Sequence, residues 1–218
     1  MQKIEGILFD CDGVILDTDN SYRLLVSNLL THTFNYPITL EQTIERWKGK
    51  NADQIARELA FEGHDFADEF IEEIHILSND YKVDESIVVP SLRLLLEETK
   101  HLPKAICSNG RAVRINSNLK DVNLHNEFDH VLGRDILGVM KPDPQVYIKG
   151  SEKIGVEIEN CIVIEDSAVG LQAAKESGAM SVGFTGTGAS KSELALLKPD
   201  FIVESLAEII PIIEKYSK

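Results

Sequence analysis

Near its N-terminus the chain reads Ile4-Glu5-Gly6-Ile7-Leu8-Phe9-Asp10-Cys11-Asp12-Gly13-Val14. The apolar run that ends at Phe9 is typical of a buried strand, and Asp10 and Asp12 follow it in a turn that contains glycine. Catalytic and ligand-binding groups of α/β proteins gather at the carboxyl ends of strands. Two like charges so close together repel each other, and a cation bound between them relieves the repulsion. The stretch therefore predicts an α/β fold with a metal-assisted nucleophile and its proton-transfer partner.

The remaining sequence divides into two kinds of pattern. From 17 to 85 apolar residues recur at helical spacing, and no convincing strand pattern interrupts them. From Ile87 onward short apolar runs alternate with helical patterns, which is typical of βαβ units and a parallel sheet. These runs are 104–107, 130–133, 161–164, 181–184 and 201–203. We predict an α/β core formed by 1–16 and 86–218, with an all-helical domain inserted at 17–85.

Composition and charge exclude several classes of function. The 218 residues, 43% of them hydrophobic, suffice for one sizeable core and a small second module. Acidic residues outnumber basic ones by 36 to 22, and a net charge of −14 opposes binding to a nucleic-acid backbone. No apolar run is long enough to span a membrane, and the N-terminus lacks the basic-then-apolar order of a signal peptide. We therefore expect a cytoplasmic protein with no nucleic-acid or membrane partner.

Two later segments carry groups that suit an anion. Ser108 and Asn109 follow the run 104–107 with a hydroxyl and an amide, although either residue alone is also explained as a helix N-cap. Lys141 lies in a loop stiffened by prolines, where a fixed ammonium beside carboxylates would hold phosphoryl oxygens. An isolated lysine in such a loop is ordinarily just solvated. Together these segments favour an anion site at the edge of the sheet.

A second acidic pair ends another predicted strand. Glu165 and Asp166 follow the run 161–164, just as Asp10 and Asp12 follow the first strand. One acidic residue at this place is explained as a helix cap, but two pairs at two strand ends indicate a site of oxygen ligands. Carboxylate oxygens of this kind suit Mg²⁺. The sequence therefore predicts a site of oxygen ligands suited to Mg²⁺, with groups for an anion beside it.

Taken in order along the chain, these motifs resemble the haloacid dehalogenase-like (HAD) hydrolase superfamily. The resemblance covers essentially the whole chain, and the helical insert resembles the cap of the β-phosphoglucomutase-like phosphatases. It implies a doubly wound, Rossmann-like parallel sheet in the order 3-2-1-4-5, with the cap over its active edge. It also implies that Asp10 is the nucleophile and Asp12 the general acid and base. The implied Mg²⁺ ligands are Asp10, Asp12 through its backbone carbonyl, Glu165 and Asp166, and the implied phosphoryl-binding residues are Ser108, Asn109 and Lys141.

The helical insert carries the information about the substrate. The stretch 47–54 resembles the substrate loop of the family, and we predict Lys48, with Lys50 as an alternative, to meet an anionic substrate; solvated lysines are the competing interpretation. Aligned with β-phosphoglucomutases, the chain has Tyr22 at the hinge histidine and Ala52 at the arginine that binds a second phosphate. Losing that anchor weakens the case for the bisphosphate intermediate of a mutase.

These features predict a phosphatase of a small phosphorylated metabolite, a sugar or sugar-acid phosphate being favoured, that works through an aspartyl-phosphate on Asp10. A sugar phosphomutase is the first alternative. A non-catalytic binding module is the second, although such a module would have no need of every catalytic residue. The predicted assembly is a monomer or a weak homo-oligomer.

Overall fold

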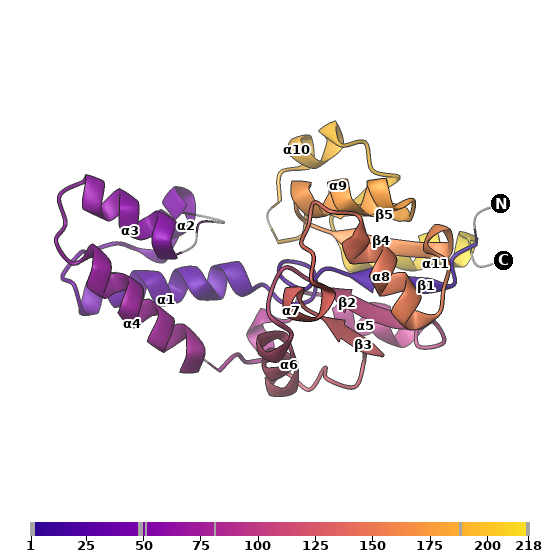
Figure 1. The fold of residues 1–218 in the computed structure, drawn as a ribbon, viewed down its shortest axis with the longest axis horizontal. Coiled ribbons are helices and arrows are strands. Elements are labelled where there is room, and N and C mark those ends of the chain that lie inside the picture. The colour runs from indigo at the N-terminus through magenta and orange to yellow at the C-terminus, as the bar shows by residue number, and fades with distance from the viewer. Residues whose placement is uncertain (1–2, 48–49, 51, 81, 188, 217–218) are drawn as a thin grey trace. The chain divides into compact units, whose positions relative to one another are not determined.

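The structure, a computed structural model, describes residues 3–47, 50, 52–80, 82–187 and 189–216 (Figure 1). Contacts divide the chain into two compact units, which are described separately: Met1–Asp17 with Val83–Lys218, and Thr18–Lys82. The predicted boundaries of the helical domain, 17 and 85, lie close to those of the second unit. That this unit is a separate cap domain stays a prediction.

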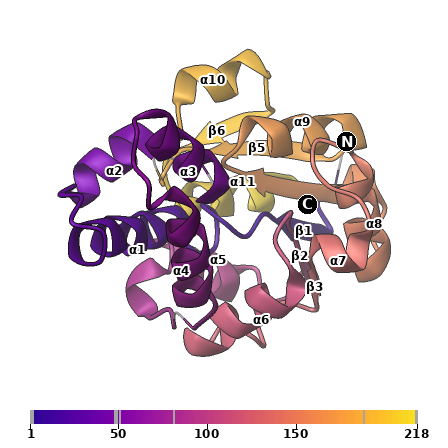
Figure 2. The same cartoon turned by 60° about the vertical axis from the view of Figure 1, so that its left-hand side comes forward.

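The first unit is built on a six-stranded parallel sheet in the order β3-β2-β1-β4-β5-β6. Figure 2 shows its strands from β6 at the top of the view to β3 at the bottom. The strands are β1 (Gly6–Phe9), β2 (Lys104–Cys107), β3 (His130–Leu132), β4 (Cys161–Glu165), β5 (Met180–Phe184) and β6 (Phe201–Val203). All six predicted strands are confirmed, and the implied order 3-2-1-4-5 is extended by β6 at one edge.

Helices cover both faces of this sheet. Helices α8 and α9 pack against the central strands on one face, and α5 lies beside α11 on the other (Figures 1 and 2). The helices of this unit are α5 (Leu92–Glu98), α6 (Ala112–Asp121), α7 (Arg134–Leu137), α8 (Gln145–Ile154), α9 (Ala168–Ser177), α10 (Lys191–Leu196) and α11 (Ile209–Tyr216). Short 3₁₀ turns occupy Glu85–Ile87, Ile158–Asn160 and Leu206–Glu208. The predicted doubly wound α/β fold is confirmed.

Close packing of α8 on the sheet depends on a glycine. A Cβ at Gly150 would lie 2.5 Å from Cys107 Sγ in β2 and 3.3 Å from Leu8 in β1. Because no such atom is present, α8 approaches the strands closely, and its Val146 and Tyr147 enter the same buried cluster as Leu8 and Cys107. The buried face of α8 thereby reaches the part of the sheet where β1 ends.

The chain leaves and re-enters the first unit through two segments that pair with each other. Asp17 N donates to Ile87 O at 2.7 Å, and Val89 N donates to Ile15 O at 3.0 Å. Leu16 and Val88 form the antiparallel bridge between these bonds. The backbone polar groups of both connections are thus satisfied within the first unit.

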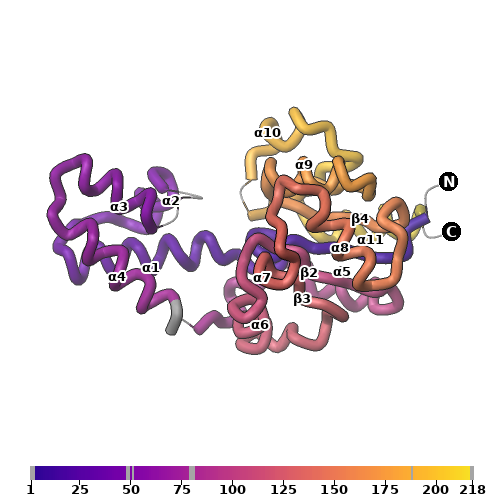
Figure 3. Tube along the Cα trace, in the orientation of Figure 1, coloured from indigo at the N-terminus to yellow at the C-terminus, as the bar shows by residue number. Residues whose placement is uncertain are grey.

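The second unit is helical in its described residues (Figure 3). Its helices are α1 (Thr18–His32), α2 (Leu40–Trp47), α3 (Ala52–Phe61) and α4 (Ala67–Asp80). They bury a core of their own that includes Leu30, Trp47, Ile55 and Phe70. No described helix of either unit is both long and apolar enough to cross a membrane.

Candidate active site

The register of the sheet brings the polar strand ends together. Phe9 in β1 pairs with Ile106 in β2 and with Ile164 in β4, so the residues that follow these positions share the carboxyl edge. Asp10 N still donates to Ile164 O at 3.0 Å, which holds the first residue after β1 against β4. In open α/β sheets this edge is where ligands bind.

Lys141 connects two carboxylates at this edge. Its Nζ lies 2.5 Å from Asp10 Oδ1 and 2.5 Å from Glu165 Oε1, and all three side chains are buried. Burial alone lowers the pKa of the Lys141 ammonium, but the charges of Asp10 and Glu165 outweigh it and raise the pKa overall. Lys141 therefore stays positively charged beside the candidate nucleophile.

Glu165 is held by donors on both oxygens. The hydroxyl of Tyr147 donates to its Oε1 at 2.5 Å, and Ser167 donates to its Oε2 through its hydroxyl at 3.0 Å and its N–H at 3.3 Å. A Cβ at Gly170 would lie 1.8 Å from Oε1, so the glycine in α9 provides the space for this carboxylate. The side chain of Glu165 is therefore committed to contacts within the protein.

The side-chain oxygens of Asn109 and Ser108 both accept hydrogen bonds from backbone N–H groups. Asn109 Oδ1 accepts the N–H of Lys141 at 2.8 Å, which anchors the loop that carries the ammonium. Ser108 is buried and its Oγ accepts the N–H of Gly110 at 2.9 Å. Because that oxygen acts as an acceptor, the Ser108 hydroxyl retains a proton for a ligand oxygen. The predicted roles of both residues in binding phosphate stay predictions.

Three acidic side chains form a cluster that fits a divalent cation. Asp10, Glu165 and Asp166 each offer one oxygen, and these oxygens lie within 4.8 Å of one another. Burial and neighbouring negative charges raise the pKa of Asp10 well above its usual range, although Lys141 opposes the shift. Burial, followed by the charge of Glu165, raises the pKa of Asp166 to about 7. A hard cation would remove this electrostatic cost, so the donor set suits Mg²⁺.

The turn after β1 brings Asp166 close to the backbone. Gly13 has φ +88°, and a Cβ there would lie 1.9 Å from Asp166 Oδ2. Thr187 Oγ1 donates to Gly13 O at 2.8 Å and holds the turn from the β5–α10 loop. The side chain of Asp12 is exposed on this turn, and its predicted part in proton transfer stays a prediction.

In the second unit, Lys48 lies outside the described residues. The alternative residue Lys50 is paired, because its Nζ lies 2.6 Å from Glu58 Oε1. The buried Arg23 in α1 donates to Lys50 O at 2.7 Å and to Asp19 Oδ1 at 2.8 Å. The charge of Lys50 is thus compensated, and its backbone is tied to the first helix of the unit.

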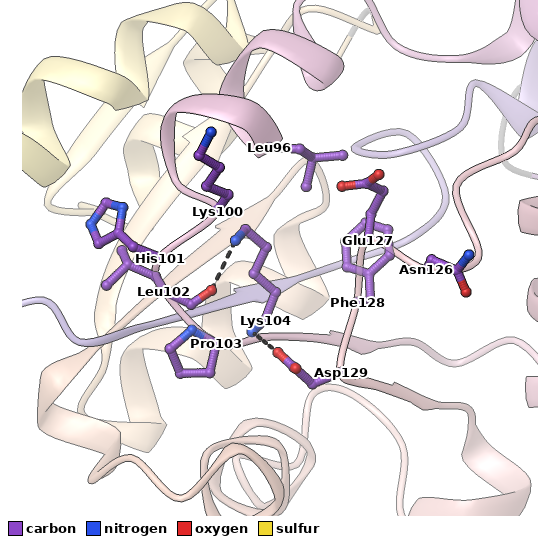
Figure 4. Close-up of a pocket in the computed structure, with 10 residues that line it drawn as sticks. All are labelled: Leu96, Lys100, His101, Leu102, Pro103, Lys104, Asn126, Glu127, Phe128 and Asp129. Carbon is purple, nitrogen blue, oxygen red and sulfur yellow. Dashed lines mark hydrogen bonds between the residues drawn. The ribbon is translucent and has the colours of Figure 1, made fainter.

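A cavity of about 480 Å³ lies at the opposite edge of the sheet (Figure 4). Its buried Lys104 begins β2, and its Nζ donates to Thr99 O at 2.5 Å and to Leu102 O at 2.8 Å. Lys104 N also donates to Asp129 Oδ2 at 2.8 Å. The Lys104 ammonium donates to the carbonyls that follow α5, so the charged group in this cavity has a structural role.

Sequence reasoning missed Tyr147 and the anchoring contact of Asn109. In the sequence, Tyr147 is recognised only as a residue on the apolar face of a helix. Its hydroxyl reaches Glu165 only when α8 is packed on β1 and β2. The available signal was a polar atom on a helix face that must be buried, because such atoms require a partner.

Comparisons with known proteins agree with this fold. A phosphoglycolate phosphatase of Salmonella typhi is 25% identical over 235 residues, which cover 97% of this chain and 93% of that protein. A HAD family hydrolase from Deinococcus radiodurans, solved with bound phosphate and sodium, superposes with a TM-score of 0.83 at 20% identity and covers 99% and 97% of the two chains. A β-phosphoglucomutase from Clostridium difficile gives 0.66 at 22% identity, with 98% and 97% covered.

The strongest assignment comes from a family model. The model of the haloacid dehalogenase-like hydrolases matches residues 7–184, a span that contains Asp10, Ser108, Lys141 and Asp166. This match confirms the resemblance inferred from the motifs and the prediction of an enzyme. The chain belongs to the haloacid dehalogenase-like hydrolase family.

Proposed function

We propose that this protein is a Mg²⁺-dependent phosphatase that hydrolyses a small phosphorylated metabolite, a sugar or sugar-acid phosphate, through an aspartyl-phosphate on Asp10. The observation that carries the proposal is the buried contact between Lys141 and Asp10 beside a cluster of acidic oxygens. A carboxylate that is paired with an ammonium and close to a cation site is suited to attack an anionic phosphoryl group.

In the first step an oxygen of Asp10 forms a bond to phosphorus while the bond from phosphorus to the substrate oxygen breaks. Asp12 gives its proton to that leaving oxygen. In the second step a water oxygen attacks phosphorus, Asp12 takes the proton of the water, and the bond to Asp10 breaks. Exposure of the Asp12 side chain supports this role, since it must meet both the leaving group and water.

The chain's own donors neutralise charge on the phosphoryl oxygens. The ammonium of Lys141 supplies one positive charge, and the proton of Ser108 supplies a hydrogen bond. Asp10, Asp166 and the backbone carbonyl of Asp12 would hold Mg²⁺, which when bound supplies further positive charge at the reacting group. Because both oxygens of Glu165 already accept protein donors, its predicted part in the metal site is better served through water.

The substrate class rests on the relatives and on the second unit. A relative bears the name phosphoglycolate phosphatase, which supports a small phosphorylated acid as substrate. Ala52 stands where the mutases of the family carry an arginine, which supports hydrolysis over transfer. The part of Lys48 in substrate binding, the helical insert as a cap, the monomeric or weakly associated state and the cytoplasmic location remain predictions.

The test is a panel of phosphorylated metabolites with Mg²⁺, read by release of inorganic phosphate. We expect release from one or a few small phosphate esters and its loss in Asp10→Asn. Asp121→Asn, an exposed charge-matched change at the end of α6, is the control and should keep full activity. Isomerisation of a sugar phosphate without release would establish the mutase instead. Turnover unaffected by Asp10→Asn would overturn the aspartyl-phosphate.

A further inference from the structure

We propose that Tyr147 is a positioning residue for this reaction: its hydroxyl holds the carboxylate of Glu165 against Lys141 and so keeps the ammonium on Asp10. The inference rests on the proposed function for the role of Asp10 and adds a residue outside the motifs that carry the family resemblance. The side chain of Tyr147 is buried in α8, and its hydroxyl donates to Glu165.

The contacts form an unbroken chain from α8 to the nucleophile. The Tyr147 hydroxyl lies 2.5 Å from Glu165 Oε1, and the same oxygen lies 2.5 Å from Lys141 Nζ. Lys141 Nζ in turn lies 2.5 Å from Asp10 Oδ1. The ammonium also lies 5.2 Å from the centre of the Tyr147 ring, within the range of a cation–π contact. One tyrosine therefore supports Lys141 both directly and through Glu165.

The hydroxyl of Tyr147 is needed because the Glu165 carboxylate has a second possible partner besides Lys141, a cation in the acidic cluster. This carboxylate belongs to the acidic cluster with Asp10 and Asp166, so a cation there would draw it away from Lys141. Gly170 provides the space that the carboxylate occupies, and Ser167 restrains only the other oxygen. Tyr147 is the donor that holds Oε1 on the side of the ammonium. Its hydrogen bond decides whether Glu165 supports Lys141 or moves toward the cation site.

The test compares Tyr147→Phe with Tyr216→Phe. Both changes remove one hydroxyl from an aromatic ring in the first unit, and Phe keeps the ring of residue 147 in the cluster around Leu8 and Val163. We expect kcat of Tyr147→Phe to fall about tenfold while KM changes less than about twofold, since the hydroxyl positions a catalytic group without meeting substrate. Tyr216→Phe, at the end of α11, should match the unaltered enzyme.

A double-mutant cycle separates positioning from simple packing. If the hydroxyl acts through Glu165, then Tyr147→Phe should cost much less in the Glu165→Gln background than in the unaltered enzyme. A packing defect would instead lower activity by the same factor in both backgrounds, with a matching fall in thermal stability. Equal factors would overturn the inference.

Crystal structures of the unaltered protein and of Tyr147→Phe decide the point without any activity. We expect the carboxylate of Glu165 to turn and the Lys141–Asp10 contact to lengthen beyond hydrogen-bond distance. Unchanged positions of Glu165 and Lys141 overturn the inference, whatever happens to kcat. Absence of phosphate release from the unaltered enzyme would instead overturn the proposed function, and the crystal comparison would still decide the position of Lys141.

Discussion

The two edges of the sheet each bury a lysine, and the lysines differ in their partners. Lys141 at the carboxyl edge contacts the carboxylates of Asp10 and Glu165, whereas Lys104 at the amino edge donates to the backbone carbonyls of Thr99 and Leu102. The carboxylates raise the pKa of Lys141 overall, while burial lowers the pKa of Lys104. Similar burial thus accompanies a charged cluster where the partners are ionised, which we propose to be catalytic, and chain anchoring where they are neutral.

The largest expected effect comes from removing each ammonium in turn. Lys141→Met should lower kcat by about a thousandfold or more, because it removes the cation beside Asp10 and leaves two buried carboxylates without it. Lys104→Met should keep kcat within about twofold but lower the free energy of unfolding by about 1–3 kcal/mol, because two buried carbonyls lose their donor. Phosphate release and urea unfolding measure the two effects. Equal losses of activity would remove the distinction between the edges.

The next effect comes from filling the space around Glu165. Gly170→Ala should lower kcat about a hundredfold, because the added Cβ would lie 1.8 Å from Oε1 and must push the carboxylate off Lys141. Gly183→Ala in β5 is the control. Its Cβ would lie no closer than 3.3 Å to any residue beyond its chain neighbours, the nearest being the apolar side chain of Leu194. Steady-state kinetics of both variants checks the expectation. An active Gly170→Ala enzyme would mean that Glu165 can be displaced without harm.

A smaller expected effect is a pH dependence of Mg²⁺ affinity and of stability that comes from the carboxyl edge and not from the amino edge. Burial and then Glu165 raise the pKa of Asp166 to about 7, so below that pH Mg²⁺ must displace a proton and should bind about tenfold more weakly for each pH unit. In the metal-free protein the sign is opposite for stability: the folded state holds this proton more tightly than the unfolded chain, so stability falls as pH rises from about 4 to 7.

Calorimetric titration with Mg²⁺ between pH 5.5 and about 8 measures the first effect, and thermal unfolding without metal measures the second. Asp166→Asn should weaken both dependences, leaving the part that comes from the raised pKa of Asp10, whereas Lys104→Met should keep them in full. A metal affinity independent of pH would place the cation away from Asp166.

The smallest expected effect concerns the loop of Lys141. Asn109→Ala should lower kcat about fivefold, because it removes the acceptor that holds the Lys141 N–H at 2.8 Å while leaving the ammonium in place. Thr99→Val, which removes a buried hydroxyl hydrogen bond beside Lys104, should lower stability and leave kcat unchanged. Kinetic assays with thermal unfolding distinguish the two. A rise in KM without a fall in kcat would favour the predicted contact of Asn109 with phosphate.

Much of the fold follows from sequence because its signals are local. The run before Asp10 and the later apolar runs each contain their own evidence of a buried strand, and all six are strands in the structure. The sequence is less informative about the second unit. Lys50, a candidate for binding the substrate, is paired with Glu58, which lies on the next helix. A charge count along the chain does not reveal which lysines are compensated.

The sequence by itself determined which polar residues reach the carboxyl edge. Parallel strands share that edge, so the residues after β1, β2 and β4 meet there once the strands are recognised. Only the tertiary structure decided the partner of each oxygen. Tyr147 meets Glu165 because Gly150 lets α8 approach β2, and Glu165 has room because Gly170 carries no side chain. Such pairings depend on the packing distance between elements far apart in the chain, which periodicity does not encode.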